Sequence, residues 1–177
     1  GNVISPDEVI KQHGADILRL LFASVDFTAD TCFSQGLLAP LLESYRKIRN
    51  TGRFLLGNLY DFEPQRHAVA VADLPEIDRW ILYRAQKLVA RALDAYAAYT
   101  FHHIVQALVT FCAVDLSALY LDIVKDRLYC SAAESPGRRA AQTTLHKLVD
   151  VLVRLMAPIL SYTADEVWSH VPGEKAT

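Results

Sequence analysis

The residues that could bind a charged partner are concentrated between residues 44 and 60, where the chain has four basic residues and no acidic one. If this stretch is helical, four of its polar residues lie on one arc of about 100°, opposite a stripe of leucines. These four are Arg46, Arg49, Asn50 and Arg53. Guanidinium groups bind phosphates bidentately, and an asparagine amide can bind a base edge or a ribose. The pattern therefore indicates a site for a polyanion.

Other features of this stretch bear on that interpretation. Gly57 and Tyr60 fall on the same arc, and a glycine there would let another backbone come close. Charged helix faces are usually solvated surfaces without a partner. A run of one sign is less ordinary in a chain with a net charge of −2, because mixed signs serve solubility better. The pattern leaves open whether the partner is RNA, DNA or an acidic protein.

A weaker basic run follows, again without an acid among its cations, which are Arg79, Arg84, Lys87 and Arg91. Trp80 precedes Arg84 by four residues, so an aromatic ring and a cation would be neighbours on one helix face. Such a pair suits the stacking of an unpaired base. A tryptophan at this position can equally anchor the core, and the sequence leaves both roles open.

The spacing of the other reactive side chains predicts no catalytic, cofactor-binding or metal-binding site. There is no glycine-rich phosphate loop and no nucleophile elbow. The adjacent His102 and His103 point about 100° apart on a helix, so they cannot share a metal ion. Asp115 and Asp122 would be about 10 Å apart along a helix, too far for one cation, and we expect them and Asp126 to pair with arginines of an adjacent helix. Three cysteines lack metal-ligand spacing and are expected to be reduced thiols: Cys32, Cys112 and Cys130.

The composition is that of a folded intracellular domain. The chain has 177 residues, of which 52% are hydrophobic and 21% charged, with only 7 Gly and 7 Pro. These values exclude a disordered, collagenous or low-complexity chain, and the length fits one domain with its own core. We see no basic-then-apolar leader and no run of about 18 apolar residues, the longest candidate being 149–160. We therefore expect a cytoplasmic protein without a membrane partner.

Helices must position these residues, because helical signals dominate the chain. Two short helices are expected at 6–13, closed by Gly14, and at 15–24, followed by a connector at 25–33 with room for one short strand. Apolar stripes predict four long helices, at 34–62, 76–96, 101–129 and 137–157. The expected N-terminal caps are Ser5, Asp73, Thr100, Ser135 and, for a short last helix, Thr163.

Four long amphipathic helices joined by short loops predict an all-α fold, an antiparallel helical bundle. The two short helices are expected to form a separate small lobe, residues 1–33, and the bundle to occupy residues 34–177. The chain starts at Gly1 without an initiator methionine and its last residues have no cap. We expect a domain cut from a longer chain.

Several stretches together resemble one protein family. The run Tyr45-Arg46-Lys47-Ile48-Arg49-Asn50-Thr51 and the residues to Leu59 are similar to the arginine-rich helix in the anticodon-binding domain of class I aminoacyl-tRNA synthetases. The isoleucyl, valyl and leucyl enzymes share that helix, whereas 120–129 and 156–168 resemble the isoleucyl enzyme. Residues 1–6 resemble the end of its Lys-Met-Ser-Lys-Ser loop, and 14–20 resemble the helix that follows. The likeness covers nearly the whole chain, in order.

The resemblance implies a module that binds the anticodon stem-loop of tRNA-Ile. The parent enzyme would use ATP to charge this tRNA with isoleucine. The small lobe would be the stem-contact linker that joins the bundle to the parent's catalytic domain. The segment alone is expected to be no enzyme and to hold no cofactor, because the family's catalytic motifs, nucleotide-binding sheet and editing domain are absent from it. DNA is not expected as a partner.

Carried over residue by residue, the resemblance implies first-choice and second-choice tRNA contacts. The first are Arg46, Lys47, Arg49, Asn50 and Arg53, and the second are Trp80, Lys125 and Arg127. Two alternatives stay open at this point. One is the same domain of a valyl or leucyl enzyme, and the other is a helical protein-interaction bundle without an RNA role.

Overall fold

The computed structural model describes residues 5–28 and 35–173. Every regular element within these two ranges is helical, so the predicted all-α class is confirmed. The elements are α1 (Pro6–His13), α2 (Ala15–Ser24), α3 (Gln35–Gly57), α4 (Pro64–His67), the 3-10 turn η1 (Val71–Asp73), α5 (Glu76–Ala97), α6 (Phe101–Thr110), the π-helix η2 (Phe111–Tyr120), α7 (Leu121–Ile123), α8 (Lys125–Tyr129), α9 (Pro136–Met156) and α10 (Ser161–His170).

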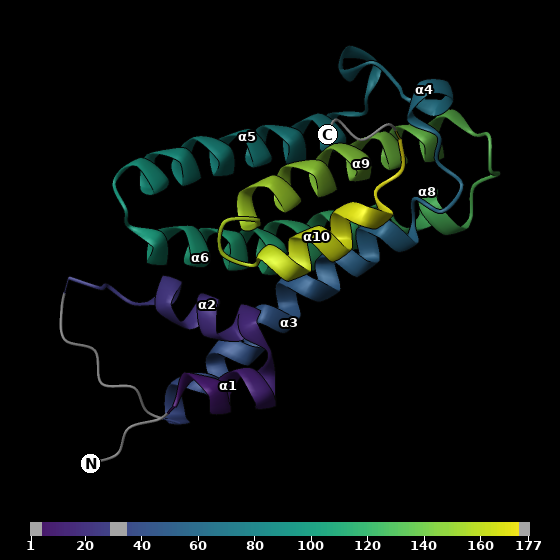
Figure 1. Ribbon diagram of the computed structural model, residues 1–177. Coiled ribbons are helices and arrows are strands. Elements are labelled where there is room, and N and C mark those ends of the chain that lie inside the picture. Colours follow the sequence, from purple (N-terminus) through teal and green to yellow (C-terminus); the bar gives the residue numbers. More distant parts are fainter. Residues whose placement is uncertain (1–4, 29–34, 174–177) are drawn as a thin grey trace.

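The long helices lie side by side as a bundle, with the short N-terminal helices at one end (Figure 1). α5 and α6 form a helical hairpin, and α5 also packs on α9. α3 packs on α9 and η2, and α10 lies against both α9 and α3. The tight turn between α5 and α6 contains Tyr99 with a φ of 57°, a left-handed conformation that is uncommon outside glycine.

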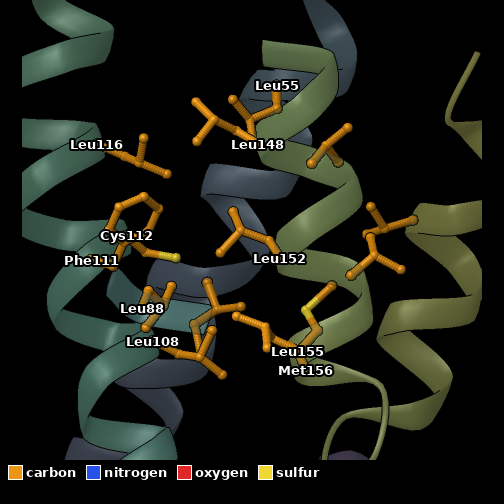
Figure 2. Packing of buried hydrophobic residues seen from close by; sticks show 14 of the residues in the cluster. Leu55, Leu88, Leu108, Phe111, Cys112, Leu116, Leu148, Leu152, Leu155 and Met156 are labelled. Carbon is orange, nitrogen blue, oxygen red and sulfur yellow. The ribbon is translucent and has the colours of Figure 1, made fainter. Parts of the chain in front are cut away.

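The core consists of the apolar stripes that the periodicity predicted. Figure 2 shows Leu148 of α9 next to Leu55 of α3, with Leu152 further along α9 and side chains of α6 and η2 opposite. Leu55 and Leu148 have no exposed surface. Burying one leucine side chain contributes about 1.5–3 kcal/mol, so these contacts strongly favour one rotation of α3 about its own axis.

The helix expected at 34–62 is shorter than predicted, because it ends at Gly57. The side-chain amide of Asn58 donates at 2.9 Å to the Phe54 carbonyl, which also accepts from the Asn58 N–H at 3.3 Å, so the bond is made where the helix ends. The chain then turns, and Leu59 and Phe62 remain buried. Tyr60 therefore lies beyond the helix, 82% exposed, and its expected place on the helical arc is wrong.

The single helix expected at 101–129 is divided into α6, η2, α7 and α8, with a break at Val124. Within η2, the hydroxyl of Ser117 donates to the Cys112 carbonyl, five residues earlier, at 2.7 Å. The same hydroxyl lies 3.4 Å from that of Thr51 on α3. π-helical segments are rare, and the apolar stripe of this stretch gave no sign of one.

One of the expected caps is confirmed and two are placed wrongly. The Ser135 hydroxyl accepts from the Arg138 N–H at 3.3 Å and caps α9. α10 begins two residues before Thr163, which is buried and donates to Asp16 at 2.6 Å instead. Asp73 is also misplaced, because it is the last residue of η1 and the N-cap of α5 is Pro75. Ser5 and Thr100 occupy N-cap positions, but their side chains make no capping bond.

The second of the small N-terminal helices, α2, shares the core of the bundle. Ile17 and Leu20 of α2 belong to the same apolar cluster as the long helices. Arg19 donates to the Ile159 carbonyl at 2.9 Å, and Asp16 accepts from the Thr163 N–H at 2.7 Å. The expected division at residue 33 stays a prediction, because it lies outside the described residues, as do Cys32, both chain ends and most of the connector.

One described segment, Phe101–Ile123, is long and apolar enough to cross a membrane by length and composition alone. The expectation that no such run exists is therefore wrong. Half of this segment is buried within the bundle, where Ile104 and Leu116 have no exposed surface. These contacts are those of a core helix.

The turn that follows α3 is held against α9 by Asp61. Its carboxylate accepts two hydrogen bonds from Arg138, at 2.6 and 2.9 Å, and one from Gln142 at 2.7 Å. Arg139 donates to the Asp61 carbonyl at 3.0 Å, and both arginines are buried. The hydrogen bonds from Arg138 lower the pKa of Asp61 to about 2.

This pKa predicts a specific loss of stability in acid. The pKa of an aspartate in the unfolded chain is about 3.9. The charged form of Asp61 therefore stabilises the fold above about pH 4, and this contribution is lost as the pH falls toward 2. We expect the unfolding free energy of the wild type to fall more steeply over this window than that of Asp61→Asn. Urea denaturation at a series of pH values measures both slopes. Asp150→Asn, which removes an exposed pair with Arg154, should keep the wild-type slope. Equal slopes for wild type and Asp61→Asn would contradict the prediction.

Candidate nucleic-acid interface

The outer face of α3 carries the basic residues that the sequence singled out. Arg46, Arg49, Asn50 and Arg53 are exposed, whereas Ile48 on the opposite side is buried. Turning these residues inward would expose the leucine stripe, so the core contacts impose their orientation. One helix therefore presents three guanidinium groups and an amide to the surroundings.

Two of the three arginines pair with glutamates at the surface. Arg46 lies 3.5 Å from Glu43 of the same helix, and Arg49 lies 3.3 Å from Glu166 of α10. The four side chains are between 48% and 68% exposed. Exposed pairs contribute at most about 1 kcal/mol, so a phosphate group could displace either carboxylate. Within the part of the chain that the structure describes, Arg53 has no carboxylate within ion-pair distance.

A hollow lies between α3 and α10. Arg49, Arg53 and Gly57 line it from α3, and Glu166 and His170 line it from α10. A phosphate placed there would meet two guanidinium groups, which attract it, and one carboxylate, which opposes it. The hollow therefore suits an anion that can replace Glu166 at Arg49.

A second hollow lies on the other side of the same arginine, toward α8. Asn50, Arg53 and Gly57 line it together with Tyr129, the last residue of α8. Tyr129 is 62% exposed, and its phenol oxygen accepts a hydrogen bond from the Asn58 amide at 3.4 Å. An exposed aromatic ring beside a guanidinium and an amide combines stacking, phosphate binding and polar recognition.

Gly57 lines both hollows, as Arg53 does. A β-carbon added at Gly57 would meet no heavy atom within 4 Å, so packing inside the protein does not require a glycine there. The missing side chain leaves the backbone at the end of α3 open to close approach by a ligand.

The remaining residues predicted to contact RNA differ in how strongly their charged groups are bound within the protein. Lys47 is exposed on the flank of α3, and Lys125 of α8 is exposed and pairs with Asp122 at 2.8 Å. Arg127 donates from both terminal nitrogens to the buried Asp78, at 2.7 and 2.6 Å, so its guanidinium is bound within the molecule. A contact of these residues with RNA stays a prediction.

The second basic run, on α5, is partly neutralised. Arg84 donates to both carboxylate oxygens of Asp115 on η2, at 3.2 and 3.1 Å. This confirms the expected pairing of Asp115 with an arginine of an adjacent helix, whereas Asp122 pairs with Lys125 three residues along the chain. Trp80 is partly buried and packs against the core, and its expected contact with RNA also stays a prediction.

The described residues contain no group of three or more His, Cys, Asp or Glu side chains placed to hold a metal ion. Cys112 and Cys130 are free thiols, and burial raises the pKa of Cys112 to about 12. The basic face and its two hollows therefore offer binding contacts, namely guanidinium groups, an amide and an aromatic ring.

Comparison with known families decides what kind of binding domain this is. A family model described as "Anticodon-binding domain of tRNA ligase" matches residues 78–177, more than half of the chain. The chain belongs to this family. The matched range includes α8 and α10, which form the outer walls of the two hollows, while α3 precedes it.

Similar proteins extend the likeness of this anticodon-binding domain to α3. The chain is 52% identical to isoleucine–tRNA ligases of Desulforudis audaxviator over 172 residues and of Moorella thermoacetica over 174 residues. It is also 52% identical to that of Symbiobacterium thermophilum over 172 residues. These matches cover 97%, 98% and 97% of the chain but only 18%, 19% and 18% of the relatives. The chain thus spans about a fifth of the length of these ligases.

Sequence reasoning did not single out the residues of this anticodon-binding domain that face α3: Tyr129, Glu166 and His170. They are distant along the chain, since 71 residues separate Asn58 from Tyr129 and 117 separate Arg49 from Glu166. The family resemblance did draw attention to these parts of the chain. Tyr129 ends the 120–129 stretch that resembles the isoleucyl enzyme, and Glu166 lies in the 156–168 stretch that resembles it too. No periodicity within one helix could show that these side chains approach α3.

Proposed function

We propose that this anticodon-binding domain holds tRNA on the outer face of α3, with α8 and α10 as the walls of the site. The observation that carries the proposal is the placing of three exposed guanidinium groups and one amide on a single helix face, with a hollow on each side. The family match supports tRNA as the polyanion.

The chemistry of the site suits RNA that is partly unpaired. Arg49 and Arg53 can hold backbone phosphates, and Asn50 can bond to a 2′-hydroxyl or a base edge. Tyr129 offers an exposed ring on which a base can stack, an interaction worth about 1–3 kcal/mol per base. Because anticodon bases are unpaired whereas stem bases are not, the hollow beside Tyr129 suits the loop, and the remainder of α3 suits the backbone next to it.

The role of the whole protein follows as a proposal from its relatives' names. We infer that the chain is part of an isoleucine–tRNA ligase, which uses ATP to charge tRNA-Ile with isoleucine in the cytoplasm. In that protein the chain would supply tRNA binding, while α1 and α2 would link it to the catalytic domain. The relatives named isoleucine–tRNA ligase support this assignment.

Replacing Arg49 and Arg53 together by alanine tests the site. We expect tRNA affinity to fall, and the slope of log affinity against log salt to flatten by about 1 for each lost phosphate contact. Titration of tRNA onto the chain at several salt concentrations measures both quantities. Arg91→Ala removes an exposed cation from α5 and should leave the slope unchanged. An unaltered slope in the double variant would place the RNA elsewhere.

Replacing Glu166 by glutamine tests whether this carboxylate competes with phosphate for Arg49. We expect tRNA to bind up to about fivefold more tightly, because an exposed ion pair is worth no more than about 1 kcal/mol and no longer has to be broken. Asp165→Asn makes the same change of charge at the neighbouring exposed position of α10 and is the control. An equal gain in both variants would mean that only overall charge matters.

The amino acid is tested with the full-length protein that carries this chain. We expect isoleucine, and not valine or leucine, to drive exchange of pyrophosphate with ATP. The double alanine variant of Arg49 and Arg53 should keep this exchange and lose efficiency in charging tRNA, because the substitutions lie on the tRNA-binding face. Exchange driven best by valine or leucine would reassign the protein to a sister ligase.

A further inference from the structure

Asp78, in the first turn of α5, is a completely buried carboxylate with a well-defined set of partners. Its Oδ1 atom accepts from the Tyr120 hydroxyl at 2.7 Å and from Arg127 Nη2 at 2.6 Å, and its Oδ2 atom accepts from Arg127 Nη1 at 2.7 Å. A buried charge is tolerated only when it is paired and hydrogen-bonded, and Asp78 satisfies both conditions. The contact with Asp78 raises the pKa of Arg127, and burial raises that of Tyr120.

The two partners of Asp78 lie on either side of the break in the helix. Tyr120 is the last residue of η2, Arg127 lies within α8, and Val124 marks the break between α7 and α8. One carboxylate on α5 therefore binds the segment before the break and the segment after it. Because both oxygens accept bonds in a defined geometry, this contact sets the direction of α8 relative to α5 and η2.

The direction of α8 in turn sets the wall of the second hollow. Tyr129 follows Arg127 by two residues and faces Asn50, Arg53 and Gly57 across that hollow. Its link to α3 is the long hydrogen bond from Asn58, at 3.4 Å, which is weaker than the three short bonds at Asp78. Of these two hydrogen-bonded links, the one at Asp78 is therefore the stronger.

We infer that Asp78 is a positioning residue for RNA binding: it contacts no RNA itself and holds α8 so that Tyr129 stands opposite Arg53. The inference rests on the function proposed above. The same inference makes Arg127 the residue through which Asp78 holds α8. Polar networks of this kind give direction to a contact, whereas apolar packing of the same volume holds a fold without specifying it as closely.

The test is a double-mutant cycle between Asp78 and Tyr129, read out as affinity for an unmodified tRNA-Ile transcript. Asp78→Asn keeps the size of the side chain and removes its charge. We expect Asp78→Asn and Tyr129→Ala each to weaken binding by about five- to tenfold, and the double variant to bind no more weakly than the worse single one. All affinities are measured at a temperature where circular dichroism shows every variant folded.

A merely structural role gives a different pattern. If Asp78 only stabilises the fold, then Asp78→Asn binds like the wild type while folded, or its loss multiplies with that of Tyr129→Ala, and either result overturns the inference. Tyr96→Phe is the matched control. Tyr96 lies in the last turn of α5, and its hydroxyl donates to the Leu155 carbonyl of α9 at 2.8 Å, away from the residues that line the two hollows. Its loss should lower thermal stability and leave affinity within about twofold.

Two further results keep the test decisive. If Asp78→Asn does not fold, Tyr120→Phe removes one of the three hydrogen bonds and leaves the ion pair in place. It should weaken binding by about two- to threefold, and combining it with Tyr129→Ala should cause no further loss. Unchanged affinity in the single variant, or a loss that multiplies with that of Tyr129→Ala, would overturn the inference. If instead the alanine variants at Arg49 and Arg53 bind normally, the proposed function fails first. Loss at those arginines with normal binding by Asp78→Asn rejects the positioning role alone.

Discussion

The burial of one face of α3 is the interaction on which the site depends. Ile48 and Leu55 are held against α9 and its neighbours in a core without room for another arrangement, so the opposite face can only point outward. Two of the guanidinium groups on that face are paired only weakly, because water screens the carboxylates near them. Within the described residues, Arg53 has no carboxylate within ion-pair distance. A rigid helix with loosely paired cations is well suited to exchange carboxylates for phosphates.

Carboxylates that accept hydrogen bonds inside the molecule organise the rest of the polar structure. Asp16 joins α2 to the start of α10, Asp61 joins the turn after α3 to α9, and Asp78 joins α5 to η2 and α8. Each bridges residues at least 42 positions apart. These bonds have a defined geometry and add to the apolar packing that orients the helices.

The parts of the fold that follow from local pattern were predictable, and those that follow from contacts were not. The long helices and the two faces of α3 come from apolar periodicity, which any amphipathic helix carries in its own residues. The π-helix, the early end of α3 at Asn58 and the burial of Thr163 depend on hydrogen bonds to particular groups, some of them far along the chain. Thr163 has the pattern of a cap and is used as the partner of Asp16.

The sequence was enough to establish the helical class, the sign and helix face of the charged site, and the family to which the chain belongs. The first two depend on residue type and on spacing within one element, and the family is evident from stretches spread along nearly the whole chain. Folding added the residues that complete the site, because Tyr129 and Glu166 reach α3 through the packing of other helices. It also assigned Arg127 to Asp78. An arginine looks the same in a sequence whether it faces solvent or a buried carboxylate, and only the arrangement of helices in space distinguishes the two.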